Sequence, residues 1–299
     1  MAFTVHEFCL GLQLPGNYYV PKDIYLGAVF RDRLGYLLKK RFCSLNDNRP
    51  GDCWNGCPRS ADCPVVKFFK TLPENYSQPY AFAFPMIKEN QSSVLPVSFR
   101  VYDGNNGLAQ ELYGHLWEAL VAGEKIGLFK QEDPYKVFPV EENNREILAH
   151  NWQTALHLTK NISEDCVALS FVTPFRLKEK GGVCHQLTGE KFLLALLNRQ
   201  GRLSRNWAGE NLPVDFKELK ASAKDITADF ELRWGSVGQR GTKKHLGHSI
   251  CFSGYHGKVT LRGNLTPWKP LLFLGQWTHI GRETVFGMGR YKIIMEDSI

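Results

Sequence analysis

Apolar side chains recur along the first half of the chain at spacings that predict alternating strands and helices. FTVHEFCLGLQLP has the alternation of a strand and ends at the turn signal Pro15-Gly16. In residues 24–42 the apolar positions recur every three, four and seven residues, which predicts an amphipathic helix; they are Leu26, Phe30, Leu34, Leu37 and Leu38. Further strands are expected in YAFAFPM, VLPVSFRVYD and YKVFPV, with a helix in GLAQELYGHLWEALVAG.

The second half repeats this order after a polar connection at residues 141–152. Strands are expected in CVALSFVTP, ITADFELRW, HSICFSGYHGKVTLRGNL and GRYKIIM, with His256 in a hairpin turn. Helices are expected in GEKFLLALLNRQGRL and PWKPLLFLGQWTHIG. Each half therefore reads β-α-β-β-α-β, and the chain is predicted to be an α+β protein of two tandem ferredoxin-like (RRM-like) domains, 1–150 and 151–299.

Composition restricts the partners and the compartment. The chain carries 37 Lys+Arg against 30 Asp+Glu, a formal charge of +7, which suits an acidic partner. No apolar run has the length of a membrane span, and the N-terminus lacks the pattern of a secretory signal. We therefore expect a cytoplasmic protein, in which clustered cysteines indicate a metal rather than disulfides.

Four of the eight cysteines lie in a turn-rich insert at residues 43–63, namely Cys43, Cys53, Cys57 and Cys63. Four thiolates are able to close a tetrahedral zinc site, with no open position left for catalysis. The gaps of nine, three and five residues are not those of a standard C-x2-C pair, so four unrelated thiols remain the alternative. The insert predicts a structural zinc clip, with an iron–sulfur cluster as a less favoured variant.

Basic residues gather on the helix at 24–42 and in a later glycine-interleaved segment. On the helix, Arg33, Tyr36 and Lys40 share one flank, with Lys39 further round, a row suited to holding phosphates. An ordinary solvated helix face is the alternative. The later segment, GSVGQRGTKKHLGHS, contains Arg240, Lys243, Lys244, His245 and His248, and a histidine there is able to transfer a proton at neutral pH. A flexible basic loop with incidental histidines explains it equally well.

A third glycine-rich segment, HIGRETVFGMGR, precedes the last predicted strand. It carries Gly281, Gly287 and Gly289 with Arg282 and Arg290. Backbone N–H groups of such a loop are able to cradle a phosphate, although turn geometry alone also accounts for glycines there. The order of residues matches neither a nucleotide P-loop nor a dinucleotide fingerprint.

The position of this loop, between the last helix and last strand of a second ferredoxin-like domain, resembles the RAMP superfamily of CRISPR-associated RNA-binding proteins. LGQWTHIGRETVFGMGRYKI is similar to the closing pattern of its pre-crRNA-processing endoribonucleases. CWNGCPRSADCPVVKFF resembles the cysteine insert of one branch, VTPFRLK a strand end, and YLGAVFRDRLGYLLKKRF the first helix.

The resemblance implies metal-independent cleavage of CRISPR repeat RNA by attack of a 2′-hydroxyl, which leaves a 2′,3′-cyclic phosphate, followed by retention of the crRNA for an effector complex. Many relatives carry a catalytic histidine on or near the first helix, and residues 24–42 contain none. Catalysis would then use Tyr25 or Tyr36 with Arg31 or Arg33, or a histidine from elsewhere, with His245 as first choice.

Two other functions remain open from the sequence. A RAMP subunit that holds guide RNA without cutting it is favoured by the missing helix histidine. A zinc-binding scaffold that contacts only proteins is disfavoured by the basic residues that accompany the glycines.

Overall fold

A computed structural model describes residues 3–14, 25–43, 63–69, 76–84, 94–104, 106–124, 135–140, 148–240 and 250–294 of the chain. The structural statements that follow concern these residues. Within these ranges, every helix is too short or too polar to cross a membrane.

The first half forms an antiparallel sheet of five strands in the order β2-β3-β1-β4, with β5 also paired to β1. Its strands are β1 (Thr4–Gln13), β2 (Tyr80–Ala83), β3 (Val94–Asp103), β4 (Lys136–Pro139) and β5 (Leu148–His150). Three helices accompany it, α1 (Leu26–Phe42), α2 (Pro64–Phe69) and α3 (Leu108–Gly123). The apolar stripe predicted for the first helix is the buried face of α1, which shares one core with α3 and the strands.

The second half forms a four-stranded antiparallel sheet in the order β11-β6-β10-β9. The strands are β6 (Cys166–Phe171), β9 (Thr227–Arg240), β10 (Ile250–Arg262) and β11 (Tyr291–Ile294). The main helices are α5 (Gly189–Leu203) and α8 (Lys269–Thr278), joined by the shorter α4 (Trp152–Leu158) and α6 (Phe216–Ser222). A two-stranded hairpin, β7 (Lys178–Glu179) and β8 (Gly182–Val183), follows β6.

Both sheets therefore place the first strand of their half in the middle, next to the third and fourth, as the ferredoxin-like pattern requires. The predicted fold of two tandem ferredoxin-like units is confirmed. The boundary at residue 150 stays a prediction. So does the metal-binding character of the insert at 43–63, because residues 44–62 lie outside the described ranges.

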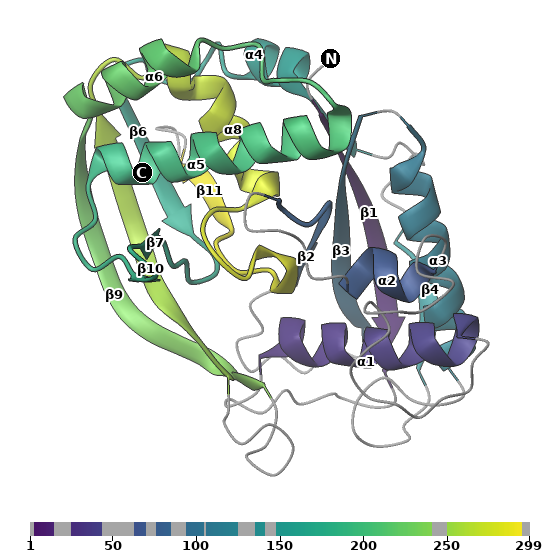
Figure 1. The fold of residues 1–299 in the computed structure, drawn as a ribbon. Coiled ribbons are helices and arrows are strands. Elements are labelled where there is room, and N and C mark those ends of the chain that lie inside the picture. Colours follow the sequence, from purple (N-terminus) through teal and green to yellow (C-terminus); the bar gives the residue numbers. More distant parts are fainter. Residues whose placement is uncertain are drawn as a thin grey trace.

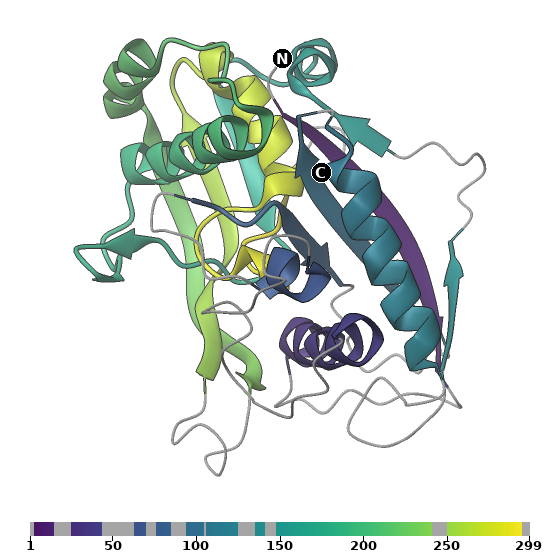
Figure 2. The same ribbon diagram turned by 45° about the vertical axis from the view of Figure 1, so that its right-hand side comes forward.

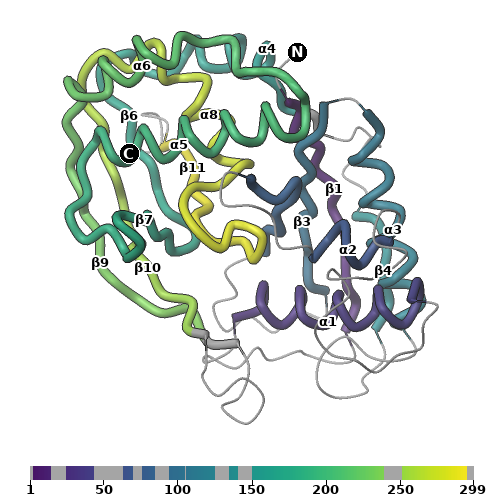
Figure 3. The backbone as a smooth tube through the Cα atoms, in the orientation of Figure 1, coloured from purple at the N-terminus to yellow at the C-terminus, as the bar shows by residue number. Residues whose placement is uncertain are grey.

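The two sheets share buried residues, so the halves are joined by a common core. Val5 of β1 and Tyr102 of β3 are buried in the same cluster as Leu196 of α5 and Leu272 of α8. Figures 1 and 2 show the segment that follows α8, in yellow, lying between the two sheets. Figure 3 shows the long β9–β10 hairpin reaching from the second sheet toward the start of α1.

The predicted hairpin turn at His256 is wrong. His256 lies inside β10, opposite Arg233 of β9. The neighbouring glycine, Gly254, marks a close approach of two backbones: a Cβ there would lie 2.5 Å from the carbonyl oxygen of Phe175. Phe175 and Tyr255 exchange two backbone hydrogen bonds of 2.9 Å at this point. The glycine therefore permits a bridge to the segment after β6, which sequence alone does not distinguish from a turn.

Candidate functional site

The glycine-rich loop, residues 279–290, lies between the two sheets. On one side it follows the segment after β6: the N–H of Arg282 donates to Arg176 (3.0 Å) and the N–H of Gly289 donates to Pro174 (2.8 Å). On the other side a Cβ on Gly287 would lie 2.8 Å from the carbonyl oxygen of Phe82 in β2. The loop is therefore packed against both halves of the molecule.

Backbone geometry accounts for the three glycines of the loop. Gly281, Gly287 and Gly289 have φ angles of +85°, +92° and +73°, in the region that favours glycine. A side chain on Gly281 would meet the carbonyl of Arg176, and one on Gly289 would meet the carbonyl of Ile280. Any larger residue would be strained in its backbone and crowded as well.

The expected phosphate cradle is not supported at two of these positions. The N–H of Gly287 donates to Thr284 (2.9 Å), and that of Gly289 donates to Pro174. The carbonyl of Gly287 accepts from the Thr173 hydroxyl (2.8 Å). Because both N–H groups are committed within the protein, Gly287 and Gly289 shape the loop rather than offer donors to a phosphate.

Helix α1 meets the loop at Phe286. The Tyr25 hydroxyl, just before α1, donates to the carbonyl of Phe286 (2.8 Å), and Phe252 of β10 packs on both rings, with centroids at 4.9 Å and 5.1 Å. A Cβ on Gly27 would collide with the same carbonyl. The start of α1, the loop and the long hairpin thus converge at one point.

Burial at this point changes the interpretation of Tyr25. Its side chain is buried, and desolvation raises the pKa of its hydroxyl well above the ordinary value for tyrosine. A tyrosine that holds its proton so firmly, and donates it to a carbonyl, is a poor base for an RNA hydroxyl. We therefore assign Tyr25 a structural role in place of the expected catalytic one.

Arg31 remains positioned for chemistry at the same junction. Its Nε is 3.4 Å from the Tyr80 hydroxyl, and its guanidinium carbon lies 4.4 Å and 4.8 Å from the ring centroids of Phe69 and Phe286. These cation–π contacts hold a positive charge beside the loop. The side chain is half-buried, which leaves part of that charge accessible.

The predicted flank of α1 lies on the surface. Tyr36 is 46% exposed, and the guanidinium of Arg33 lies 4.5 Å from the centroid of its ring. Lys40 is exposed and Lys39 is half-buried. The spacing therefore correctly placed one aromatic ring and its cations on an outward face, and their role toward RNA stays a prediction.

Three groups of expected site residues cannot be placed. Lys243, Lys244, His245 and His248, together with Cys53 and Cys57, lie outside the described residues, as does the side chain of Arg240. Cys43 ends α1 and Cys63 precedes α2. Among the described residues alone, no group of three or more potential ligands is placed to hold a metal ion.

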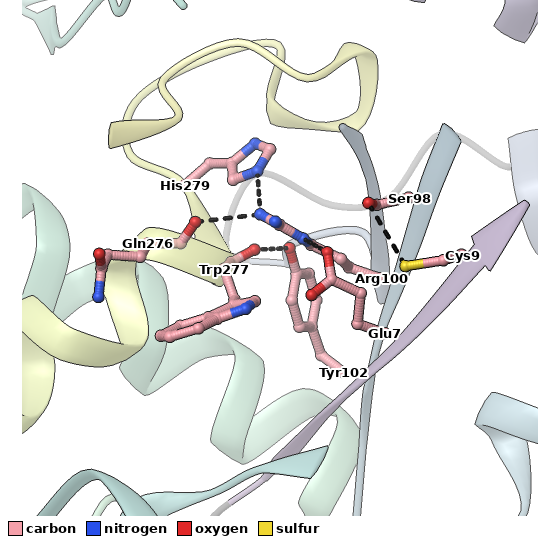
Figure 4. Close-up of polar contacts among 8 residues, drawn as sticks. All are labelled: Glu7, Cys9, Ser98, Arg100, Tyr102, Gln276, Trp277 and His279. Carbon is pink, nitrogen blue, oxygen red and sulfur yellow. Dashed lines mark hydrogen bonds and ion pairs between the residues drawn. The ribbon is translucent and has the colours of Figure 1, made fainter. Parts of the chain in front are cut away.

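A buried polar cluster, not foreseen from the sequence, fixes the start of the loop (Figure 4). Arg100 of β3 donates from Nε to Glu7 (2.8 Å) and from Nη1 to the carbonyl of Gln276 (3.0 Å), and Nη1 also lies 2.9 Å from Nε2 of His279. The Tyr102 hydroxyl donates to the carbonyl of Trp277 (3.1 Å). Strand β3 of the first half thus caps the last carbonyls of α8, where a cation is favoured by the helix dipole.

The cluster sets the protonation of its members. Burial opposes the charge on Glu7, but the charge and hydrogen bond of Arg100 outweigh it, so the pKa of this carboxyl is lowered. Burial and then the charge of Arg100 hold the pKa of His279 well below its ordinary value. His279 is therefore neutral at pH 7, its Nε2 accepts from Arg100, and it has a positive φ of 59° at the end of α8. A charged residue inside the apolar strand VLPVSFRVYD was the available sequence signal.

Arg290, at the far end of the loop, lies under the same electrostatic influence. Burial first, and repulsion from Arg100 second, lower its pKa to about 10. Its backbone N–H donates to the Thr173 hydroxyl (2.9 Å). Arg290 thus carries its charge at pH 7 in a crowded cationic environment, which an anion would relieve.

Comparisons with known proteins agree with this architecture. Residues 169–291 match the model of a family described as "CRISPR-associated endoribonuclease Cas6". Comparison with curated protein sequences gives no match. The matched segment runs from β6 to β11 and includes the whole glycine-rich loop, so the resemblance noted in the sequence is confirmed there.

Solved structures share the fold across nearly the whole chain. A Cas6 product complex superposes with a TM-score of 0.61 at 17% identity, over 98% of this chain and 100% of that one. Cas6 from Thermus thermophilus gives 0.58 at 16% identity, over 98% and 100%. The Cas6-containing chain of a partial Cas6–RT–Cas1–Cas2 complex gives 0.54 at 12% identity, over 99% of this chain and 47% of that one.

Proposed function

We propose that this chain is an endoribonuclease that cleaves precursor CRISPR RNA within the repeat and then retains the product. The observation that carries the proposal is the family match across residues 169–291, which contain the glycine-rich loop. The contact of that loop with the start of α1 supports it, because it brings the basic first helix to the same part of the molecule.

The proposed reaction needs no metal. A 2′-hydroxyl of the RNA attacks the adjacent phosphorus, the P–O5′ bond breaks, and the products are a 2′,3′-cyclic phosphate and a 5′-hydroxyl. The step requires a base for the 2′-oxygen, a proton for the leaving 5′-oxygen and cations near the phosphorane. Arg31 supplies a held positive charge beside the loop, and Tyr36 with Arg33 presents an accessible phenol and guanidinium on α1.

His245 is the proposed proton-transfer residue. Histidine is the side chain whose ordinary pKa suits this role near neutral pH. Strands β9 and β10 join the sequence that contains His245, and Phe252 of β10 packs on Tyr25 at the start of α1. The hairpin and the first helix are therefore neighbours, which supports a joint site.

A guide-RNA-binding subunit without cleavage is the second candidate. It is favoured by the absence of histidine from residues 24–42 and by the burial of His279, which removes that histidine from contact with RNA. Such a subunit would use the same basic surface to hold RNA without breaking it.

One assay separates the two. Purified protein in excess is mixed in EDTA with an end-labelled RNA that carries the CRISPR repeat of the host genome. We expect one discrete cut, blocked by a single 2′-deoxy substitution immediately upstream of the broken bond. Tight binding without a cut would support the guide-RNA subunit, and affinity no greater than for random RNA would exclude both.

Zinc, partners and location complete the proposal. Cys43, Cys53, Cys57 and Cys63 would hold a structural Zn²⁺, since four thiolates suit a closed tetrahedral site. Other CRISPR effector subunits are the proposed partners, in line with the solved assembly in which a Cas6 unit accompanies Cas1 and Cas2. The proposed location is the cytoplasm.

A further inference from the structure

A basic cleft of about 760 Å³ lies on the side of the glycine-rich loop that faces α5. Helix α5, the β7–β8 hairpin and the first residues of the loop form its walls. Five cationic side chains line it against a single carboxylate, Glu179; they are Lys178, Lys191, Arg199, Arg202 and Arg282. This excess of positive charge in a concave site attracts anions.

One of these cations is paired, which shows how the cleft is built. Lys191 of α5 lies 2.9 Å from one carboxylate oxygen of Glu179 and 3.1 Å from the other, so the pair ties α5 to the hairpin. The carboxylate in the cleft is thereby neutralised. Arg282 is exposed at the opposite wall.

Arg199 provides a donor that lacks an acceptor. Its Nε donates to the carbonyl of Thr278 at the end of α8 (2.6 Å), which holds the guanidinium in place. Its Nη2 is buried and has no hydrogen-bond partner among the described residues. A buried N–H without a partner costs free energy, and an anionic oxygen in the cleft would satisfy it.

The remaining lining is apolar. Leu177, Leu194 and Ala195 contribute to the walls beside the cations. Ser77 also lines the cleft, and the preceding residue, Tyr76, is 44% exposed. Apolar and aromatic surface next to cations is the combination that takes an unpaired nucleotide, whose base has an apolar face and whose backbone is charged.

We propose that this cleft binds an unpaired strand of RNA. The inference rests on the proposed function and deepens it. The cleft reaches the loop at Gly281 and Arg282, whereas α1 reaches it at Phe286. RNA would therefore contact the protein on two sides of one loop, with the unpaired strand in the cleft and the scissile region beside α1.

The test uses the full-length protein and 5′-fluorescein-labelled decauridine, which has neither a repeat sequence nor a hairpin. Binding is followed by anisotropy from 50 to 200 mM NaCl. The variant Arg202→Gln/Arg282→Gln removes two cleft cations, and Lys217→Gln/Lys220→Gln removes two exposed cations of α6 as a matched control. Far-UV circular dichroism and melting curves confirm that both are folded.

We expect the cleft variant to weaken binding by about tenfold or more at 50 mM NaCl and to lower the magnitude of the salt slope by about 1.4, since each contact to a single-strand phosphate contributes about 0.7. The control should retain the wild-type affinity and slope. A decauridine with one 4-thiouridine should cross-link to peptides from residues 176–202.

An equal effect of the two variants, or cross-links confined to other segments, would overturn the proposal. Displacement of decauridine by polyglutamate at equal charge concentration would also overturn it, because the site would then take any polyanion. Failure of the proposed function gives a different result: repeat RNA would stay intact while decauridine still bound in the cleft.

Discussion

Replacing Arg100 by methionine tests how the first half of the molecule holds the glycine-rich loop. Arg100 is 7% exposed and pairs with Glu7, with both side chains 9% exposed. The substitution keeps much of the side-chain volume. It removes the ion pair with Glu7 and the contacts with the carbonyl of Gln276 and the imidazole of His279.

The expected cost follows from the burial of the pair. Removing one partner of a buried ion pair leaves an uncompensated charge and lowers the free energy of unfolding by about 3–5 kcal/mol. The Gln276 carbonyl, at the end of α8, also loses a donor. The double variant Glu7→Leu/Arg100→Met replaces both charges by apolar side chains, so it should recover more than about 1 kcal/mol of this loss.

Urea unfolding followed by tryptophan fluorescence measures these differences. The pH dependence supplies an independent check. The folded pKa of Glu7 is lowered, so its ionised form stabilises the protein above the unfolded pKa of 4.5, and this stabilisation is lost as the pH falls through the folded pKa. The gap between wild type and Arg100→Met should therefore shrink in acid.

The reasoning fails if Arg100→Met lowers the free energy of unfolding by less than about 1 kcal/mol, against the about 3–5 kcal/mol expected for a broken buried pair. It also fails if the double variant is no more stable than the single one. A gap between wild type and Arg100→Met that is constant from pH 7 to pH 3 would show that Glu7 is not the partner that matters.

Three further predictions concern the loop, the hairpin and the cysteine insert. Gly289→Ala should destabilise the protein by about 1–3 kcal/mol in urea unfolding, because of its positive φ and the carbonyl of Ile280; Gly114→Ala, with open space at the same test inside α3, should instead stabilise by about 0.5–1 kcal/mol, and equal effects would contradict the account. His245→Ala should lower the single-turnover cleavage rate by about 10²–10⁴-fold without weakening RNA binding, and an unchanged rate would remove His245 from the reaction. Mass spectrometry under native conditions should find one Zn²⁺ per chain, lost in Cys53→Ser, whereas a metal-free wild type would refute the zinc clip.

Local patterns predicted the elements well where one face is buried. The spacing of Leu26, Phe30, Leu34 and Leu37 predicted α1 and its buried side, because an amphipathic helix has the same period wherever it packs. The doubled β-α-β-β-α-β order led to the two sheets for the same reason. The exposed position of Tyr36 also followed from helical periodicity.

The candidate site was only partly predictable. The glycines of the loop were identified, but whether their N–H groups face a ligand or the protein depends on what lies opposite. For Gly289 that neighbour is Pro174, more than a hundred positions away in the sequence. The burial of Tyr25 likewise depends on Phe252 and Phe286, which no pattern around residue 25 reveals.

By itself the sequence determined the local features of this protein: its helices and strands, its repeated order, its positive charge and the glycines that a left-handed backbone requires. Only the tertiary structure decided which groups are free to act. It buried Tyr25, placed Arg31 between two aromatic rings, joined Arg100 to the end of α8 and opened a basic cleft beside the loop. The physical reason is that periodicity and propensity act over a few residues, whereas desolvation and charge pairing depend on residues brought together from distant parts of the chain.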